Sequence, residues 1–263
     1  EGNRAWQVQF WPDKKNLVGR QVEQLVNGDK PVDAASLAKS SVVVRGLSAY
    51  EYILFDSKPD AANAEQKARY CPLLVAIGEH QKALAEEILK GWNNTDGMLA
   101  QMTKFPNQRY ADSHEAIADL LRAQVTALDT LKKKLGAPMG RLSKGIPQPL
   151  QAEAWRSHSS LKSLEASLTA AQTVWVGVDN QGLRGLLGKD QKALADKIDA
   201  AYANALKLLA ANQKPLGELL EDEAGRQQLN AIYDSLNVVH RLHEGELAKA
   251  LGIQLGFNAN DGD

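Results

Sequence analysis

The chain has 263 residues, 44% hydrophobic and 24% charged, and its 31 basic and 32 acidic side chains leave a formal net charge of −1. Such a balance gives no electrostatic footprint for nucleic acids or anionic membranes, which require a concentrated basic face. The sequence contains no apolar run of about 18 residues, so no transmembrane helix is expected. Its length favours two domains of about 100–150 residues over one core.

Apolar residues recur at helical spacing, without the alternation typical of strands, which predicts an all-α protein. The first predicted helix, 13–27, follows Pro12 and ends at Gly28. Asp33 or Ser36 can cap a short helix that leads into residues 42–56. The β-branched run at 42–44 is interpreted as the buried first turn of a helix, because no partner strand is found nearby.

Further helices are predicted at 60–92, with a kink at Pro72, and at 113–135. The segment GAPMGRLSKGIPQP starts at Gly136 and contains three prolines. This composition predicts a linker at residues 137–149. Helices at 150–175, 190–211 and 222–251 follow. We therefore expect two helical-bundle domains, 1–136 and 150–263. The single cysteine, Cys71, lies in the apolar stretch RYCPLLVAIG, which predicts a buried, inert thiol.

Polar residues interrupt the apolar segment 42–56, VVVRGLSAYEYILFD. In a continuous helix, Arg45, Ser48 and Glu51 form one polar stripe, flanked by Tyr50 and Tyr52. A carboxylate among apolar residues needs a partner or a function, because burying an unpaired charge is costly. The stripe is a candidate pocket wall; the alternative is that Glu51 pairs with a buried arginine and only fixes helix packing.

The segment WRSHSS supplies a second candidate, with Trp155, Arg156, Ser159 and Ser160. In a helix Arg156 and Ser160 share a face, and Arg156 can offer its guanidinium to Glu51 or to an anionic ligand. The alternative interpretation is ordinary serine capping of a helix, with Trp155 in the core.

His240, His243 and Glu244 form a third cluster, in VVHRLHEGE. Histidines three positions apart beside a carboxylate can bind a transition metal, but such residues on an exposed, charged helix end are more commonly a solvated face. The HExxH spacing is absent, as are a nucleophile elbow, a phosphate-binding glycine loop and a dinucleotide fingerprint.

The segment GLSAYEYILF resembles the signature of the imelysin family, also called peptidase family M75 or the iron-regulated protein A group. The family pattern is Gly-x-His-x-x-Glu; this chain keeps Gly46 and Glu51 and has Ser48 in place of the histidine. Residues 4–22 resemble the segment that precedes the motif, and residues 153–168 resemble the start of the second domain of the family. The resemblance thus extends over most of the chain.

The resemblance implies two helical bundles around an inter-domain cleft that the motif faces. It implies an exported protein, periplasmic or attached to the outer membrane as a lipoprotein, with its signal and further helices ahead of Glu1, and a link to iron-uptake components. The cofactor expected is iron or another divalent metal, with Glu51, His240 and His243 as candidate ligands. A small ligand, a metal or a peptide in the cleft would contact these residues: Arg45, Ser48, Tyr50, Glu51, Trp155, Arg156, Ser159 and Ser160.

Ser48 weakens the case for peptidase chemistry. Catalytic zinc normally has three protein ligands and an open position for water. A serine hydroxyl is a poor transition-metal ligand, and the missing histidine is also the missing general base. We therefore predict a non-catalytic ligand- or metal-binding protein linked to iron uptake. The alternatives are a metallopeptidase in which Glu51 activates a metal-bound water, and a scaffold whose cleft is only a domain interface.

Overall fold

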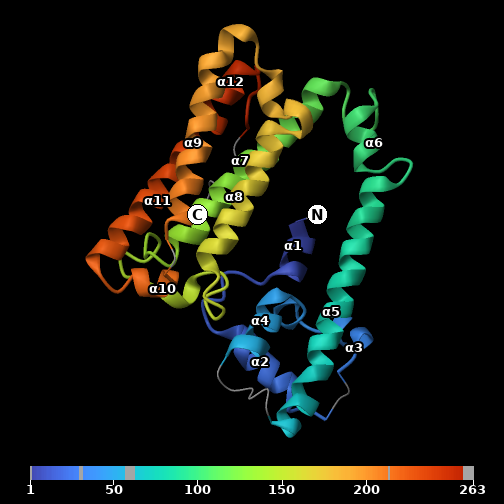
Figure 1. Cartoon of the computed structure of the whole chain (residues 1–263). Helices are drawn as coiled ribbons and strands as arrows, with labels where there is room; N and C mark the ends of the chain where they lie inside the picture. Colours follow the sequence, from blue (N-terminus) through green and yellow to red (C-terminus); the bar gives the residue numbers. More distant parts are fainter. Residues whose placement is uncertain (1, 30–31, 57–62, 213, 257–263) are drawn as a thin grey trace. The chain divides into compact units, whose positions relative to one another are not determined.

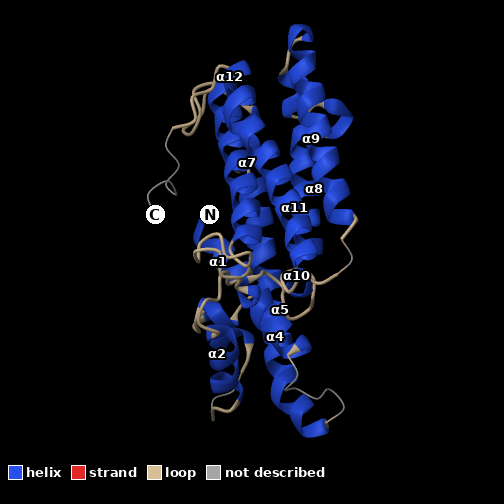
Figure 2. Ribbon diagram, turned by 90° about the vertical axis from the view of Figure 1, so that its left-hand side faces the viewer, coloured by secondary structure: helices blue, strands red, loops and turns tan. Residues whose placement is uncertain are grey.

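The computed structural model describes residues 2–29, 32–56, 63–212 and 214–256. These residues form helices, turns and loops without a strand (Figure 2), which confirms the all-α prediction. None of the described helices has the length and apolarity that crossing a membrane requires. The chain divides into two compact units, Glu1–Gln101 with Glu153–His158, and Met102–Ala152 with Ser159–Asp263.

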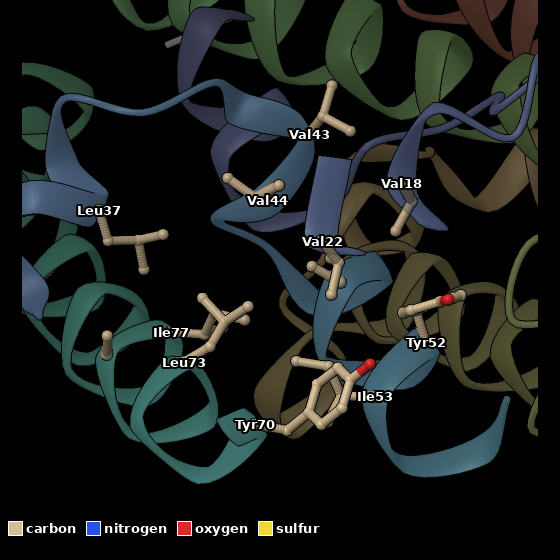
Figure 3. Close-up of a cluster of buried hydrophobic side chains, with 12 residues drawn as sticks. Val18, Val22, Leu37, Val43, Val44, Tyr52, Ile53, Tyr70, Leu73 and Ile77 are labelled. Carbon is tan, nitrogen blue, oxygen red and sulfur yellow. The ribbon is translucent and has the colours of Figure 1, made fainter. Parts of the chain in front are cut away.

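The first unit packs short helices against one long helix (Figure 1). Its elements are α1 (Gly2–Val8), α2 (Leu17–Val26), α3 (Ala34–Ala38), the 3-10 turn η1 (Val42–Val44), α4 (Leu47–Phe55) and α5 (Ala64–Asn93), and α6 (Met98–Thr103) contains the boundary. Their apolar faces meet in one core (Figure 3), formed by Val18, Val22, Leu37, Val43, Val44, Ala49, Tyr52, Ile53, Tyr70, Leu73, Ala76 and Ile77. Burial of these side chains is the main stabilising term for the unit.

The segment 42–56 is not one helix, so the predicted stripe from Arg45 to Glu51 is wrong. The chain makes the turn η1, passes through Arg45, and starts α4 after Gly46, which is the extended N-cap residue. A Cβ atom on Gly46 would lie 2.6 Å from the carbonyl oxygen of Val8. Because the motif glycine has no side chain, the backbone at the end of α1 can lie against the backbone at the start of α4.

Cys71 is exposed, in contrast to the predicted buried thiol. Helix α5 packs with one face only: Tyr70, Leu73 and Ile77 are buried, whereas Cys71 and Val75 face away from the core. An apolar stretch around a cysteine does not specify which face of the helix carries it. Pro72 lies in the interior of α5, and the kink expected there stays a prediction.

The second unit is a four-helix bundle in which α7 contacts α8 and α11, and α9 contacts the same two helices (Figure 1). Its elements are α7 (Ser113–Gly136), η2 (Pro149–Gln151), α8 (Ser160–Val176), η3 (Val178–Asn180), η4 (Leu183–Leu186), η5 (Lys189–Gln191), α9 (Lys192–Ala210), α10 (Leu216–Leu219), α11 (Glu223–Arg241), the π-helical segment η6 (Leu242–Leu247) and α12 (Ala248–Ala250). Antiparallel neighbours of this kind bury a continuous apolar centre.

Two predicted helices differ from those observed. The helix expected at 150–175 begins only at Ser160. Ala154 and His158 have positive φ angles, so a regular helix cannot continue through either residue. The helix expected at 222–251 is interrupted by η6. The units also differ in extent from the expected domains: α7, which we placed with the N-terminal bundle, packs on α8 and α11 of the second unit.

Candidate functional site

Helix α4 positions the two polar residues of the Gly-x-Ser-x-x-Glu segment. Ser48 is buried, and its hydroxyl donates a hydrogen bond to the backbone carbonyl of Phe10 at 3.0 Å. The hydroxyl thus holds the loop after α1 against α4. The position where the family pattern has histidine serves here as a packing contact with a satisfied donor.

Glu51 holds the segment 153–158 within the same unit. Its Oε1 atom accepts hydrogen bonds from the backbone N–H of Ser157 at 2.8 Å and from the Ser157 hydroxyl at 2.7 Å. Both donors are neutral. Among the described residues, no cation pairs with Glu51, and its Oε2 atom receives no hydrogen bond. This carboxylate is half-buried and keeps one oxygen for a further donor or cation.

Arg156 pairs with Asp56 and not with Glu51, so the pairing considered from the sequence is not the one observed. Its Nε donates to Asp56 Oδ2 at 3.3 Å, and a terminal nitrogen donates to Asn16 Oδ1 at 2.9 Å. The guanidinium carbon lies 5.2 Å from the ring centroid of Tyr52 and 4.5 Å from that of Trp155. At 9% exposure, Arg156 is buried and satisfied by ion pairing and cation–π contacts.

A third carboxylate, Glu23, is linked to this polar network through Tyr52, whose ring lies near Arg156. Its Oε1 accepts hydrogen bonds from the hydroxyls of Tyr52 at 2.9 Å and Tyr70 at 2.8 Å. Burial, reinforced by the hydrogen bond to Glu23, raises the pKa of Tyr70 to about 12 and also raises the pKa of Tyr52. Both tyrosines therefore remain neutral donors at physiological pH.

The other predicted site residues lie elsewhere. Arg45 donates to the carbonyl of Ala38 at 3.0 Å. Tyr50 is half-buried against the core of the first unit. Ser159 and Ser160 belong to the second unit: Ser159 occupies the N-cap position of α8 without a side-chain capping bond, and Ser160 is buried in the first turn. Trp155 is half-buried, and its ring contacts Arg156.

His243 is buried in the second unit, so its interpretation as part of a solvated face is wrong. Its Nδ1 lies 2.9 Å from the carbonyl of Val239, which fixes a proton on that nitrogen. Its Nε2 lies 3.3 Å from the hydroxyl of Tyr202, and that hydroxyl accepts a hydrogen bond from Gln124 at 2.9 Å. Burial lowers the pKa of His243 to about 4. With both nitrogens engaged, the ring is a core element rather than a free ligand.

His240 is also buried, although Glu244 beside it is exposed. Its Nδ1 lies 3.0 Å from Nζ of Lys132, which also contacts Asp129 at 3.3 Å. Burial, and secondarily the charge of Lys132, lowers the pKa of His240. A lysine ammonium at the nitrogen competes with any metal for the same lone pair.

The donor sets do not fit a metal centre held by the protein. Among the described residues, no group of three or more histidine, cysteine, aspartate or glutamate side chains is placed to hold a metal ion. At the motif, the donors are one carboxylate, from Glu51, and the hydroxyl of Ser48, which is already directed at Phe10. Zinc and iron cofactor sites normally need more ligands than this.

The sequence did not indicate four residues of the network: Ser157, Asp56, Asn16 and Glu23. Ser157 lies inside WRSHSS, so the segment was recognised without the residue that makes the contact. Glu23 lies 29 and 47 positions from its two tyrosine partners, and no sequence pattern links them. An alignment showing these positions to vary together would be the signal for such contacts.

The fold and this network define an all-α protein of two helical units whose first unit carries a half-buried carboxylate on a Gly-x-Ser-x-x-Glu helix. The family model of imelysin, peptidase family M75, matches residues 1–243, and the chain belongs to this family. An imelysin-like protein from Psychrobacter arcticum 273-4 has a similar structure, with a TM-score of 0.76 and 22% sequence identity over 97% of this chain and 74% of that chain. A search of curated protein sequences finds no match.

Proposed function

We propose that this imelysin-family protein is an exported, non-catalytic binding protein that takes a cationic ligand at Glu51 and serves iron uptake. The observation that carries the proposal is the state of the Glu51 carboxylate. It is half-buried, held in place through one oxygen by two neutral donors, and left with a free second oxygen and no counter-ion among the described residues.

Charge complementarity favours a cation at this position. A partly buried carboxylate gains more from an opposite charge than a fully solvated one, because fewer water molecules screen the pair. Arg156 does not neutralise Glu51, since its guanidinium is directed at Asp56 and Asn16. A hydrated iron cation, bound as cargo through its water shell, matches the hard oxygen of Glu51.

The iron link and the export to the periplasm or outer membrane rest on the resemblance of the motif segment and its flanking segments to imelysin sequences. The absence of catalysis rests on the donor set. Ser48 replaces the histidine that would be the metal ligand or general base, and its hydroxyl is held by Phe10.

The rival function is a metallopeptidase in which Glu51 activates a metal-bound water. Helix α4 carries no histidine beside Glu51. In the second unit both nitrogens of His243 are engaged, by Val239 and Tyr202, and Nδ1 of His240 is engaged by Lys132. Degradation of unstructured casein that stops on addition of a chelator would support this rival and contradict the non-catalytic proposal.

Calorimetric titration with ferrous iron under anaerobic conditions, and separately with 1,4-diaminobutane as an organic dication, tests the binding proposal. The variant Glu51→Gln keeps the oxygen that accepts from Ser157, removes the charge and replaces the free oxygen by a neutral NH2 group. We expect it to weaken binding of the favoured cation at least about tenfold, equivalent to about 1.4 kcal/mol.

The matched control is Glu86→Gln, an exposed carboxylate on α5. It should bind the cation like the unmodified protein. If neither cation binds, or if Glu51→Gln binds as tightly as Glu86→Gln, the proposal is wrong and the scaffold alternative is favoured.

A further inference from the structure

The second unit contains a pocket of about 630 Å³ beside the π-helical segment η6. Its walls come from α7, from η6 with α12, and from residues 252–256, which follow α12. All of these belong to the second unit, so the pocket shares no lining residue with the site around Glu51. A volume of this size accommodates a small ligand of several residues or rings.

The interrupted helix lines the pocket. A π-helical turn inserts an extra residue and is common at functional sites. Here η6 places Gly245 on the pocket wall, where an added Cβ would meet no atom within 4 Å. The exposed Gly245 thus leaves space at this point of the pocket wall that a larger side chain would fill. Val125 and Ala248 line the pocket beside it and are otherwise buried, so this part of the lining is apolar.

The chain returns along this pocket through a helix C-terminal motif. The backbone N–H of Ile253 donates to the carbonyl of Ala248 at 2.8 Å, and Gly252 has a φ of 65°, as a Schellman turn requires. Beyond Ile253, the backbone groups of residues 254–256 make no hydrogen bond with a described residue. Main-chain donors and acceptors are therefore available along one wall, which is the feature that peptide-binding edges use.

The pocket also presents charges of both signs. Lys249 makes no ion pair or hydrogen bond through its ammonium with a described residue. Glu244 lies 3.9 Å from Nδ1 of His240, beyond hydrogen-bonding distance, and has no other described partner. Arg122 lines the same pocket and shares Asp119 with Arg109, so two cations divide one carboxylate. An ammonium group and a carboxylate can both find an opposite charge here.

We propose that this pocket binds a short peptide with free termini and an apolar side chain. The peptide backbone pairs with the free main-chain groups of residues 254–256, and the apolar side chain enters the space left by Gly245. The terminal ammonium lies near Glu244, and the terminal carboxylate lies near Lys249 and Arg122. This inference does not depend on the function proposed for Glu51.

The test is an NMR titration of the ¹⁵N-labelled full chain with the tripeptide Ala-Leu-Ala. We expect saturable shifts of the amide signals of Gly245, Gly252 and Gly256. The same peptide with acetylated and amidated ends should bind at least about threefold more weakly, because it lacks both terminal charges. The substitution Gly245→Leu fills the pocket and should weaken binding at least about tenfold.

Gly91→Leu is the matched control, since Gly91 on α5 also has open space at its Cβ but lies outside the pocket. It should bind like the unmodified chain. Lys249→Ala changes an exposed side chain, so it keeps the test decisive if Gly245→Leu misfolds, and it should weaken the tripeptide more than the blocked peptide. The proposal is overturned if no saturable shift occurs up to about 10 mM peptide, or if Lys249→Ala binds both peptides as the unmodified chain does.

Discussion

Glu51 and Ser157 are 106 positions apart, yet two short hydrogen bonds join them inside the first unit. Hydrogen bonds to a charged acceptor are stronger than those between neutral groups. The carboxylate on α4 therefore fixes residues 153–158, a segment whose flanking residues on both sides belong to the second unit. At this residue the motif has a structural role in addition to the binding role that we propose.

Ser157→Ala tests the structural role. It removes the hydroxyl bond to Glu51 and leaves the backbone bond, so the free energy of unfolding should fall by about 1–2 kcal/mol. Urea unfolding followed by circular dichroism measures the change. Ser40→Ala removes an exposed hydroxyl bond to Ser36 and should change stability by less than about 0.5 kcal/mol. Equal effects of the two substitutions would contradict a special role for Ser157.

His243 makes the stability of the second unit depend on pH. Its pKa is about 4 in the folded protein because the ring is buried, against 6.5 in an exposed position. Between these values the unfolded chain binds more protons than the folded one, so stability falls as the pH falls from 6.5 to 4. The loss from this ring is about 3 kcal/mol at most. The lowered pKa of His240 acts in the same direction.

Urea unfolding at several pH values between 4 and 7 checks this expectation. His243→Phe keeps an aromatic ring in the site and should reduce the slope of stability against pH, whatever its effect at pH 7. His114→Ala, a change of an exposed histidine on α7, should retain the full slope. An unchanged slope in His243→Phe would show that the ring is not held neutral.

At the scale of elements, Gly46 determines how α1 meets α4. A methyl group there would contact the backbone of Val8 at 2.6 Å, and backbone atoms cannot move aside as a side-chain tip can. The family motif keeps its glycine in this chain although it has lost its histidine. Close packing of two helix ends explains the glycine without any appeal to metal chemistry.

Gly46→Ala should therefore lower the free energy of unfolding by about 1–3 kcal/mol through overpacking. Gly78→Ala is the contrasting variant, because Gly78 lies in α5 with open space at its Cβ. Alanine is favoured over glycine inside a helix, so this variant should be as stable as the unmodified protein or more stable by up to about 1 kcal/mol. Thermal unfolding by circular dichroism compares the two, and a neutral Gly46→Ala would contradict the packing argument.

At the scale of the whole molecule, the two units are not simply consecutive along the chain. The first unit takes residues 153–158 from between η2 and α8, and Arg156 and Ser157 of this segment supply its contacts to Asn16, Glu51 and Asp56. The second unit contains its own four-helix core. The first unit therefore depends on a distant piece of sequence.

Fragments test this dependence. Residues 102–263 alone should unfold cooperatively, because all four bundle helices are present. Residues 1–101 alone should be less stable than the same fragment fused through a glycine–serine linker to residues 153–158. The difference should become smaller when the fused segment carries Arg156→Ala and Ser157→Ala, because only the backbone bond from Ser157 to Glu51 then remains. Equal urea midpoints for the three versions of the first unit would refute the dependence.

Local patterns in the sequence predicted much of the fold. Helical periodicity identified α5, α7, α9 and most of α11. Asp33 or Ser36 was predicted as a cap, and Asp33 is the N-cap residue, whose side chain accepts a hydrogen bond from the backbone N–H of Ser36. Periodicity could not detect the π-helical turn in η6, because one inserted residue changes the pattern too little. It also placed Cys71 inside, since a mostly apolar stretch does not reveal which residues lie on the packed face.

The sequence by itself determined the all-α class, the Gly-x-Ser-x-x-Glu motif that carries Glu51 and the resemblance to imelysins, because these depend on residues that are neighbours along the chain. Only the tertiary structure decided that Glu51 pairs with Ser157 and that Arg156 pairs with Asp56 and Asn16. It also decided that His240 and His243 are buried. These pairings join residues up to 140 positions apart. Which residues pair depends on how whole helices pack. The spacing of residues within one segment does not specify that packing.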